Sequence, residues 1–329
     1  MYTCRFIQDY ASSDRIINMQ SSEIRFVERV CRTSTPCADE FFIEKTAYNS
    51  NPVVDTPQGR YEGLEQIDLF CAAWLKSFRA KSAEVIPVVQ TTAGERSATE
   101  MVVRLDLGER TQEIPMMVIG DVRVDGKMEG LRVYFWWNWV EGFSPYRPPV
   151  YKPTYTTPGE LSLLTGYMRQ YYESLHNPNS AEALEDIMGT MEDEIKFGGY
   201  APVELERKKW GEFAESGLSN LEMHRNIYRD DILYNTPKWR SVRFETIIDD
   251  GKTCVIEWVL TVNPVGIENH TASQAGVAAY ERGLSGKLKA IRICDNLQRE
   301  SEKELDFANT KITNYITAYP HIGYNWLHK

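Results

Sequence analysis

A short pattern of residues occurs twice in this chain of 329 residues, once in each half. The first copy contains Gly126-Lys127-Met128 and Leu131-Arg132-Val133, and the second contains Gly286-Lys287-Leu288 and Ile291-Arg292-Ile293. Upstream of each copy, SATEMVVRL (97–105) matches CVIEWVLTV (254–262), which aligns Glu100 with Glu257. Two matches in the same order favour an internal duplication, and a chain of this length is typical of two domains of roughly 150 residues.

The two copies are separated by a proline-rich segment, FSPYRPPVYKPTYTTPG (143–159). Its five prolines are incompatible with a helix interior or a central strand, so the segment is predicted to be an extended connector. We therefore expect a first domain over 1–145, a linker over 146–160, a second domain over 161–296, and a C-terminal helix and tail over 297–329.

Apolar residues in each half recur first with helical spacing and then with the alternation of strands. The predicted helices of the first half cover 22–32, 38–45 and 61–78, and its predicted strands cover 83–90, 97–107, 114–124 and 128–139. Asp125-Gly126 predicts a tight hairpin turn, because glycine tolerates positive φ. In the second half, helices are expected over 162–176, 181–191, 202–215 and 297–318, and strands over 239–248, 253–263, 272–282 and 288–295.

Composition narrows the classes of partner and cofactor. A formal net charge of −10 disfavours nucleic acid and anionic membranes as partners. The sequence has neither the ~18-residue apolar run of a membrane span nor the apolar start of a signal peptide, and its six cysteines show no metal-ligand spacing. We therefore expect a cytoplasmic protein with reduced thiols, no metal and no cofactor.

Four segments carry a resemblance to a known superfamily: PQGRYEGLEQIDLF (57–70), VDGKMEGLRVYF (124–135), VIEWVLTV (255–262) and SGKLKAIRICDN (285–296). They resemble the long helix, the closing strand and the central strand of nuclear transport factor 2-like (NTF2-like) and SnoaL-like proteins. The resemblance implies an α+β fold with two tandem cone-shaped, cystatin-like barrels. Each would be a strongly bent, mostly antiparallel sheet, with helices closing an apolar pocket.

Within that superfamily, residues 104–135 resemble the limonene-1,2-epoxide hydrolase family. That family opens an epoxide with an Asp-Arg-Asp set, and a Tyr and an Asn hold the water. The resemblance implies these roles for Arg104 and Asp106, and the water-holding role for Asn51. Val133 stands where the family has its second Asp, the base toward water, so an intramolecular nucleophile or a proton shift is favoured over hydrolysis.

Strand alternation places Glu100, Val102, Arg104 and Asp106 on one face of a strand. If that face lines the pocket, an arginine between two carboxylates could set up acid–base catalysis, with Glu100 as the substitute base. The alternative is an exposed row of ion pairs on the outer face, worth ~0–1 kcal/mol and without a catalytic role.

In the second half, Glu257 and Asp295 are the candidate pocket acids. Glu257 could act as a general base if it faces the pocket. Alternatively, Trp258 faces inward as a core residue and Glu257 faces out. Asp295 could likewise be a pocket acid or the polar end of a strand.

The closing strand of the first half has two faces. By the family register, Leu131, Val133, Phe135 and Trp137 line the pocket. Arg132, Tyr134 and Trp136 then lie on the outer face of the domain, where Tyr134 and Trp136 form an aromatic patch. We expect the other domain or a second subunit to cover this patch. The side chains expected to bind substrate are Asn51, Val133, Phe135, Trp137, Trp258 and Asn263.

These observations lead to one main hypothesis about function and two others. The chain is predicted to be a cofactor-independent enzyme (an isomerase, cyclase, dehydratase or epoxide-opening enzyme) that acts on a hydrophobic small molecule. The catalytic candidates are Asp106, Arg104, Glu100, Glu257 and Asp295. The second hypothesis is a binding protein for a lipid-like ligand, and the third is that one domain is degenerate and purely structural. A homodimer through the outer sheet face is left open.

Overall fold

The computed structural model describes residues 17–46, 49–135, 161–175, 180–199, 225, 239–262 and 272–298. The chain divides into two compact units, Met1–Thr156 and Thr157–Lys329, and each has its own sheet and helices. The fold is therefore mixed α+β, and the division falls inside the predicted linker. None of the helices in these described ranges has the length and hydrophobicity needed to cross a membrane.

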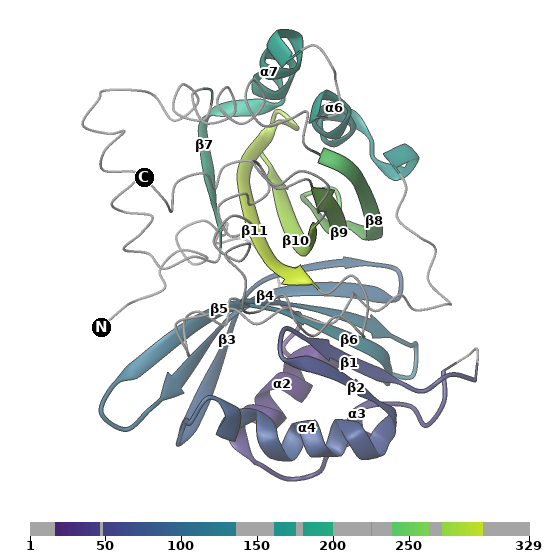
Figure 1. The fold of residues 1–329 in the computed structure, drawn as a ribbon, viewed down its shortest axis with the longest axis vertical. Coiled ribbons are helices and arrows are strands. Elements are labelled where there is room, and N and C mark those ends of the chain that lie inside the picture. Colours follow the sequence, from purple (N-terminus) through teal and green to yellow (C-terminus); the bar gives the residue numbers. More distant parts are fainter. Residues whose placement is uncertain are drawn as a thin grey trace. The chain divides into compact units, whose positions relative to one another are not determined.

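The first unit consists of a six-stranded sheet with helices on one of its faces (Figure 1). Its elements are α2 (Ser22–Arg32), α3 (Ala38–Phe41), β1 (Val53–Thr56), β2 (Gly59–Glu62), α4 (Gly63–Ser77), β3 (Ser82–Ala93), β4 (Arg96–Asp106), β5 (Thr111–Val122) and β6 (Met128–Tyr134). The strand order is β2-β1-β6-β5-β4-β3. All neighbours are antiparallel except β1 and β6, which are parallel.

The helices of the first unit form where the apolar spacing predicts them. Helix α2 has the predicted bounds and buries Ile24, Val27 and Val30 on one face, as its 3.6-residue period requires. Helix α4 is shorter than predicted, because Tyr61 and Glu62 pair with β1 as part of β2. The chain turns from β2 into α4 at Gly63, whose φ of +81° is readily adopted only by glycine.

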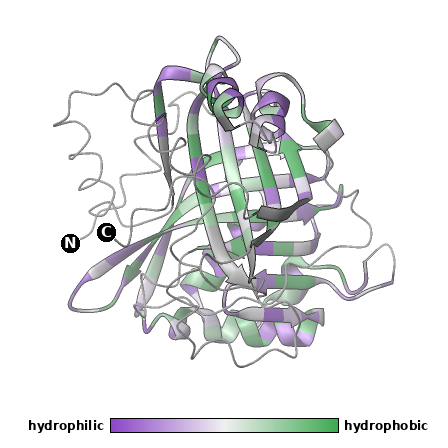
Figure 2. Ribbon diagram, turned by 45° about the horizontal axis from the view of Figure 1, so that its top comes forward, coloured by the Kyte–Doolittle hydropathy of each residue, from purple (hydrophilic) through white to green (hydrophobic). Residues whose placement is uncertain are grey.

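The core of the first unit lies between its helices and one sheet face. A chain of aromatic contacts runs through it, with ring centroids 5.7 Å apart for Phe70–Trp74, 5.2 Å for Trp74–Phe78 and 5.7 Å for Phe78–Phe135. These separations are those of rings in direct contact. The hydrophobic segments of these elements are visible in Figure 2. Aromatic side chains thus connect α4 to the end of β6 within this core.

The second unit repeats this topology with one strand fewer. Its elements are η1 (Leu161–Leu163), α6 (Gly166–Leu175), α7 (Ser180–Gly189), β7 (Met191–Gly199), β8 (Trp239–Asp249), β9 (Thr253–Val262), β10 (Ala272–Arg282) and β11 (Leu288–Gln298). The strand order β7-β11-β10-β9-β8 corresponds to β1-β6-β5-β4-β3, and again only the first pair, β7 and β11, is parallel.

The register of the two sheets agrees with the sequence repeat. Glu100 pairs with Met117, and Glu257 pairs with Val277 at the corresponding place. The repeated glycines close the same turn: the N–H of Gly126 donates to the carbonyl of Arg123 at 2.9 Å, and the N–H of Gly286 donates to the carbonyl of Gly283 at 3.0 Å. Both glycines have φ of +81°. The aligned motifs therefore occupy equivalent positions, while their origin by duplication stays a prediction.

Several expectations about the fold require correction. Both sheets are open, with β2 and β3 or β7 and β8 at their edges, and they are not strongly curled, so the strongly bent, closed barrel is not confirmed. Strands β1, β2 and β7 were not predicted. The predicted helix over 297–318 begins with two residues of β11, and its remainder lies outside the described residues, as does the predicted helix over 202–215.

Candidate functional site

The two faces of the first sheet are distinguished by contacts to α2. Ser97 and Thr99 of β4 donate hydrogen bonds to Glu23 of that helix, so the odd-numbered residues of this part of β4 face the helices. Because side chains alternate along a strand, Glu100, Arg104 and Asp106 face away from them.

Arg104 lies in a partly exposed cross-strand row. Its guanidinium donates to Glu113 Oε1 at 2.9 and 3.0 Å and to Glu84 Oε2 at 2.7 Å, and these are the residues directly opposite it on β5 and β3. The hydrogen bond to Glu113 is the main cause that raises the pKa of Arg104, although its side chain is 40% exposed. This is the ion-pair row that the sequence left open as the alternative, and such exposed pairs contribute ~0–1 kcal/mol each.

Asp106 and Asn51 have other partners than the sequence predicts. Asp106 is exposed, and its Oδ1 accepts a hydrogen bond from the N–H of Gly108 at 2.8 Å. Asn51 is also exposed, and its Oδ1 accepts one from Lys45 Nζ at 2.6 Å. Arg104 and Asp106 thus bond to different groups and not to each other. The catalytic roles of Arg104 and Asp106 and the water-holding role of Asn51 stay predictions.

The other predicted site residues divide between the two faces. Glu100 and Glu257 are both buried, on the face turned away from the helices. Trp258 is buried on the helix side, so the arrangement with Trp258 inward and Glu257 outward is the observed one. Val133 and Phe135 lie in the core beside the helices, as the family register predicts. Trp137, Asn263 and the side chain of Asp295 lie outside the described residues.

The aromatic patch expected on the outer face of β6 is not exposed at Tyr134. This side chain is fully buried within the chain, which agrees with the expectation that the patch is covered, while the element that covers it stays a prediction. Trp136 lies outside the described residues.

A buried ion pair recurs on that face in both units, and the sequence reasoning missed it. Arg132 of β6 donates to Asp121 of β5, and at the corresponding place Arg292 Nη1 donates to Glu281 Oε2 at 2.9 Å. All four side chains are at most 5% exposed. A second cation supports each acid: Arg96 Nε lies 3.3 Å from Asp121 Oδ1, and Lys289 Nζ lies 3.0 Å from Glu281 Oε1. One sequence feature points to this pair: an acidic residue precedes each repeated turn, Asp121 in the first half and Glu281 in the second.

The electrostatics of this pair are clear in the second unit. Burial favours the neutral form of Glu281 and would raise its pKa, but Arg292 and Lys289 outweigh it and hold the pKa below its usual value. A buried carboxylate with two cationic partners is therefore kept ionised, which suits a structural pair better than a proton-transferring group.

The carboxylate on the helix side of the first sheet is Glu23, in the first turn of α2. It is 1% exposed, and its Oε1 accepts hydrogen bonds from Gln90 Nε2 at 2.9 Å, Ser97 Oγ at 2.7 Å and Thr99 Oγ1 at 3.2 Å. Its Oε2 is buried and has no hydrogen-bond partner among the described residues. An acid in the first turn of a helix is typical of a solvated position that stabilises the helix dipole, so nothing in the sequence indicates this burial.

The second unit has no such polar cluster at the equivalent described positions. By strand register, apolar or aromatic residues replace each partner of Glu23. Gln90, Ser97, Thr99 and Gly120 correspond to Ile247, Cys254, Ile256 and Tyr280.

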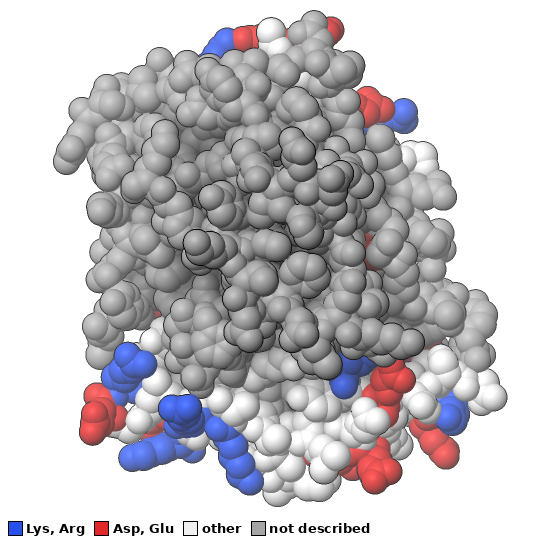
Figure 3. Space-filling model, in the orientation of Figure 1, with Lys and Arg blue, Asp and Glu red and all other residues white. Residues whose placement is uncertain are grey.

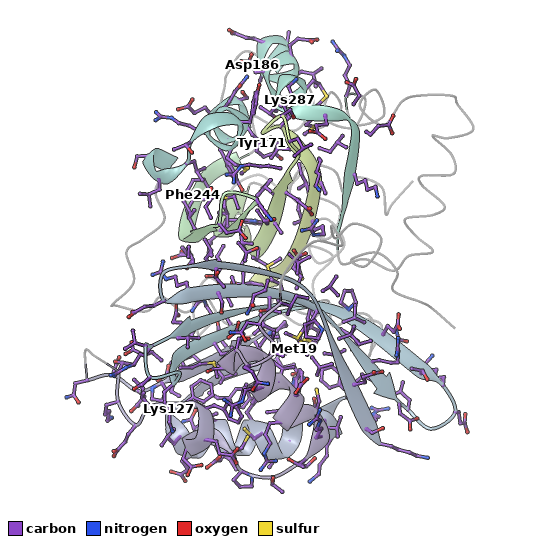
Figure 4. All side chains as sticks on the ribbon, turned by 180° about the vertical axis from the view of Figure 1, so that it is seen from behind. Met19, Lys127, Tyr171, Asp186, Phe244 and Lys287 are labelled. Atoms are coloured by element: carbon purple, nitrogen blue, oxygen red, sulfur yellow. The ribbon has the colours of Figure 1, made fainter. Side chains whose placement is uncertain are left out.

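Tyrosine rings fill this place in the second unit. The hydroxyls of Tyr280 and Tyr172 are hydrogen-bonded at 2.7 Å, and burial raises the pKa of Tyr172. Tyr171 packs against both rings, and Phe244 packs against Tyr172 (Figure 4). The buried carboxylate cluster is thus a feature of the first unit.

The described residues show mixed surface charge and no arrangement of metal-binding side chains. Charges of both signs lie on the described surface of the first unit in Figure 3. Within the described ranges, no group of three or more His, Cys, Asp or Glu side chains is arranged to hold a metal ion.

Comparisons with known proteins give structural neighbours only, since no protein family and no curated protein matches the sequence. One similar solved structure is a protein named as a SnoaL-like polyketide cyclase from Jannaschia sp., with 15% identity, a TM-score of 0.27, and coverage of 38% of this chain and 91% of that chain. Another is an NTF2-like protein of unknown function from Cytophaga hutchinsonii, with 16% identity, a TM-score of 0.27, and coverage of 37% and 93%.

A third neighbour is a protein named as a polyketide cyclase from Sinorhizobium meliloti, with 18% identity, a TM-score of 0.23, and coverage of 29% of this chain and 75% of that chain. By name, these neighbours come from the superfamily that the sequence resembles. Identities and TM-scores of this size decide no activity for this chain.

Proposed function

We propose that the chain is a cofactor-independent enzyme that uses Glu23 for acid–base catalysis on a hydrophobic small molecule in its first unit. The observation that carries this proposal is the buried carboxylate on the helix side of the sheet, with one oxygen held by three neutral donors and the other without a described partner. A general base must be oriented and must keep one oxygen available within about 2.6–3.2 Å of the proton that it takes.

The arrangement around Glu23 supplies the orientation. Gln90, Ser97 and Thr99 come from two adjacent strands and fix Oε1. Oε2 is then the atom that would accept a proton from a carbon or oxygen acid and return it elsewhere on the same molecule. Aromatic and aliphatic side chains of the neighbouring core suit a hydrophobic substrate.

A single carboxylate favours some members of the proposed reaction class. An isomerase, cyclase or dehydratase can act with one group that takes and returns a proton, whereas hydrolytic epoxide opening needs a second base to activate water. Arg104 and Asp106, which the resemblance to limonene-1,2-epoxide hydrolase singles out, face away from the helices. We therefore favour a proton shift or cyclisation on a tandem SnoaL-like scaffold.

The second candidate is a non-catalytic role for the second unit, as a ligand-binding or purely structural copy. It is favoured by the tyrosines that occupy the place of the Glu23 cluster there. On this proposal, only the first unit carries out chemistry.

Exchange of carbon-bound hydrogen in D₂O tests the proposal without knowledge of the final product. The intact chain is incubated with hydrophobic ketones and terpene-like compounds, and deuterium uptake is followed by mass spectrometry. We expect uptake into at least one compound, and a fall of roughly 10²–10⁴ in its rate for Glu23→Gln.

Glu28→Gln is the matched control, because Glu28 lies on the same helix and its pair with Arg32 is at the surface. It should leave the exchange rate unchanged. Uptake that is the same in Glu23→Gln and wild type would overturn the assignment of Glu23. The absence of uptake from every compound that measurably raises the thermal midpoint of the chain would favour a binding protein.

A further inference from the structure

Two cysteine sulfur atoms meet in the first unit. The Sγ atoms of Cys37 and Cys71 are 3.1 Å apart and hydrogen-bonded, and both side chains are at most 1% exposed. Cys37 immediately precedes α3, and Cys71 lies in the middle of α4. Nothing in the sequence pairs them, because a separation of 34 positions matches no recognised cysteine motif.

The backbone of Cys37 is fixed to the helix that carries Cys71. Asp68, on α4, accepts hydrogen bonds on Oδ1 from the N–H groups of Cys37 at 2.8 Å and of Ala38 at 2.7 Å. The contact between the two sulfur atoms is therefore held by a second set of bonds from the same helix. Forming a bond of 2.03–2.05 Å would require the sulfur atoms to approach by only about 1 Å.

The two thiols differ in acidity. The hydrogen bond between the two thiols is the main cause that lowers the pKa of Cys37, and Arg29 lowers it further, against the opposing effect of burial. The same hydrogen bond and burial raise the pKa of Cys71. Cys37 is thus the thiol that ionises first, and the thiolate is the form that attacks a disulfide.

We propose that Cys37 and Cys71 form a reversible intrachain disulfide, so that the first unit contains a redox site that takes a low-molecular-weight disulfide as its oxidant. The Cys37 thiolate attacks one sulfur of the oxidant, forms a mixed disulfide and releases one thiolate. Cys71 then gives its proton to solvent, and its sulfur displaces the second thiolate from Cys37. Two electrons pass from the protein to the oxidant, which leaves as two thiols.

Access to the buried pair is provided by the segment before α3. Thr35 and Pro36 are exposed, and the oxidant would reach Cys37 through a local opening of this short segment that breaks the two hydrogen bonds to Asp68. Cys31 provides a matched comparison, because it is equally buried, has no cysteine partner among its described contacts, and burial raises its pKa to about 12.

The test uses the full chain in glutathione buffers that range from fully reduced to fully oxidised, followed by alkylation and peptide mass spectrometry. In the oxidised buffer we expect the count of alkylated thiols to fall by two, with one cross-linked peptide that joins Cys37 to Cys71. The Cys31→Ser variant should give the same cross-link. Cys37→Ser and Cys71→Ser should each abolish it, and far-UV circular dichroism verifies that both variants are folded.

Limited access is separated from lack of reactivity by repeating the measurement after unfolding in urea and refolding in the oxidised buffer. A wild-type chain that keeps all its thiols in both protocols would overturn the proposal. So would a stable glutathione adduct on Cys37 without closure to Cys71, or a cross-link from Cys37 to any other cysteine.

Discussion

Replacing Arg132 by methionine removes one partner of the buried ion pair in the first unit. Methionine keeps the length and apolar stem of the side chain but removes the guanidinium. Asp121, only 5% exposed, then keeps Arg96 at 3.3 Å as its cationic neighbour. The variant therefore leaves a buried carboxylate that is only partly compensated.

The expected loss of stability follows from that environment. Removing one partner of a buried pair destabilises a protein by about 3–5 kcal/mol, because an uncompensated charge stays in the interior. Arg96 reduces the penalty, so we expect the lower end, about 3 kcal/mol. For a unit of about 150 residues this corresponds to a fall of roughly 6–12 °C in the thermal midpoint.

The control is Arg104→Met, which also removes an arginine with carboxylate partners, but one whose side chain is 40% exposed. It should cost less than about 1 kcal/mol. Differential scanning calorimetry and urea unfolding of the intact chain measure both variants, and the double change Arg132→Leu with Asp121→Leu should recover most of the loss. Equal, small effects of Arg132→Met and Arg104→Met would refute the view that burial determines the strength of these pairs.

Two further predictions concern the second unit. Gly276→Ala should destabilise it by about 1–3 kcal/mol, because the new Cβ would overlap Cζ2 of Trp258. Gly189→Ala, with its nearest contact at 4.0 Å, should be nearly neutral, and calorimetry compares the two variants. Since the folded-state pKa of Glu281 lies below its ordinary value of 4.5, its ion pair with Arg292 contributes stability above that value and loses it as the pH falls through the lowered pKa. Urea unfolding at a series of acid pH values should thus show a smaller acid-induced loss for Glu281→Gln than for wild type, and identical slopes would contradict this.

Much of the secondary structure could be predicted, because local periodicity and turn chemistry are strong in these segments. Apolar spacing predicts helix α2, and the need for positive φ predicts the turn at Gly126. The alignment of Glu100 with Glu257 agrees with the register of the two sheets. Strands β1, β2 and β7 were missed. Strands β1 and β2 have four residues each, which is too short for a clear alternation of apolar and polar residues. Strand β7, MEDEIKFGG, is rich in charged residues, so its sequence does not indicate that it pairs with the distant β11.

The candidate site was less predictable, because it depends on which face each strand presents to the helices. Alternation shows that Glu100, Arg104 and Asp106 share a face but not which face that is. The burial of Glu23 could not be predicted, because it depends on residues of β3 and β4 that are distant in sequence and not on its own neighbours along the chain. Tertiary packing therefore determines both which face of β4 meets the helices and whether Glu23 is buried.

Gly120 and Tyr280 occupy corresponding positions on β5 and β10, and this difference limits how parts of the two units can be exchanged. A Cβ on Gly120 would lie 3.4 Å from the Cβ of Glu23, so the helix fills this space in the first unit, whereas the strand itself fills it in the second. A chimera that carries β10 beneath α2 would place a tyrosine where the helix already packs, and one that carries β5 beneath α6 would leave a hole. Helix and strand therefore form one module that has to be grafted, or has to evolve, as a whole.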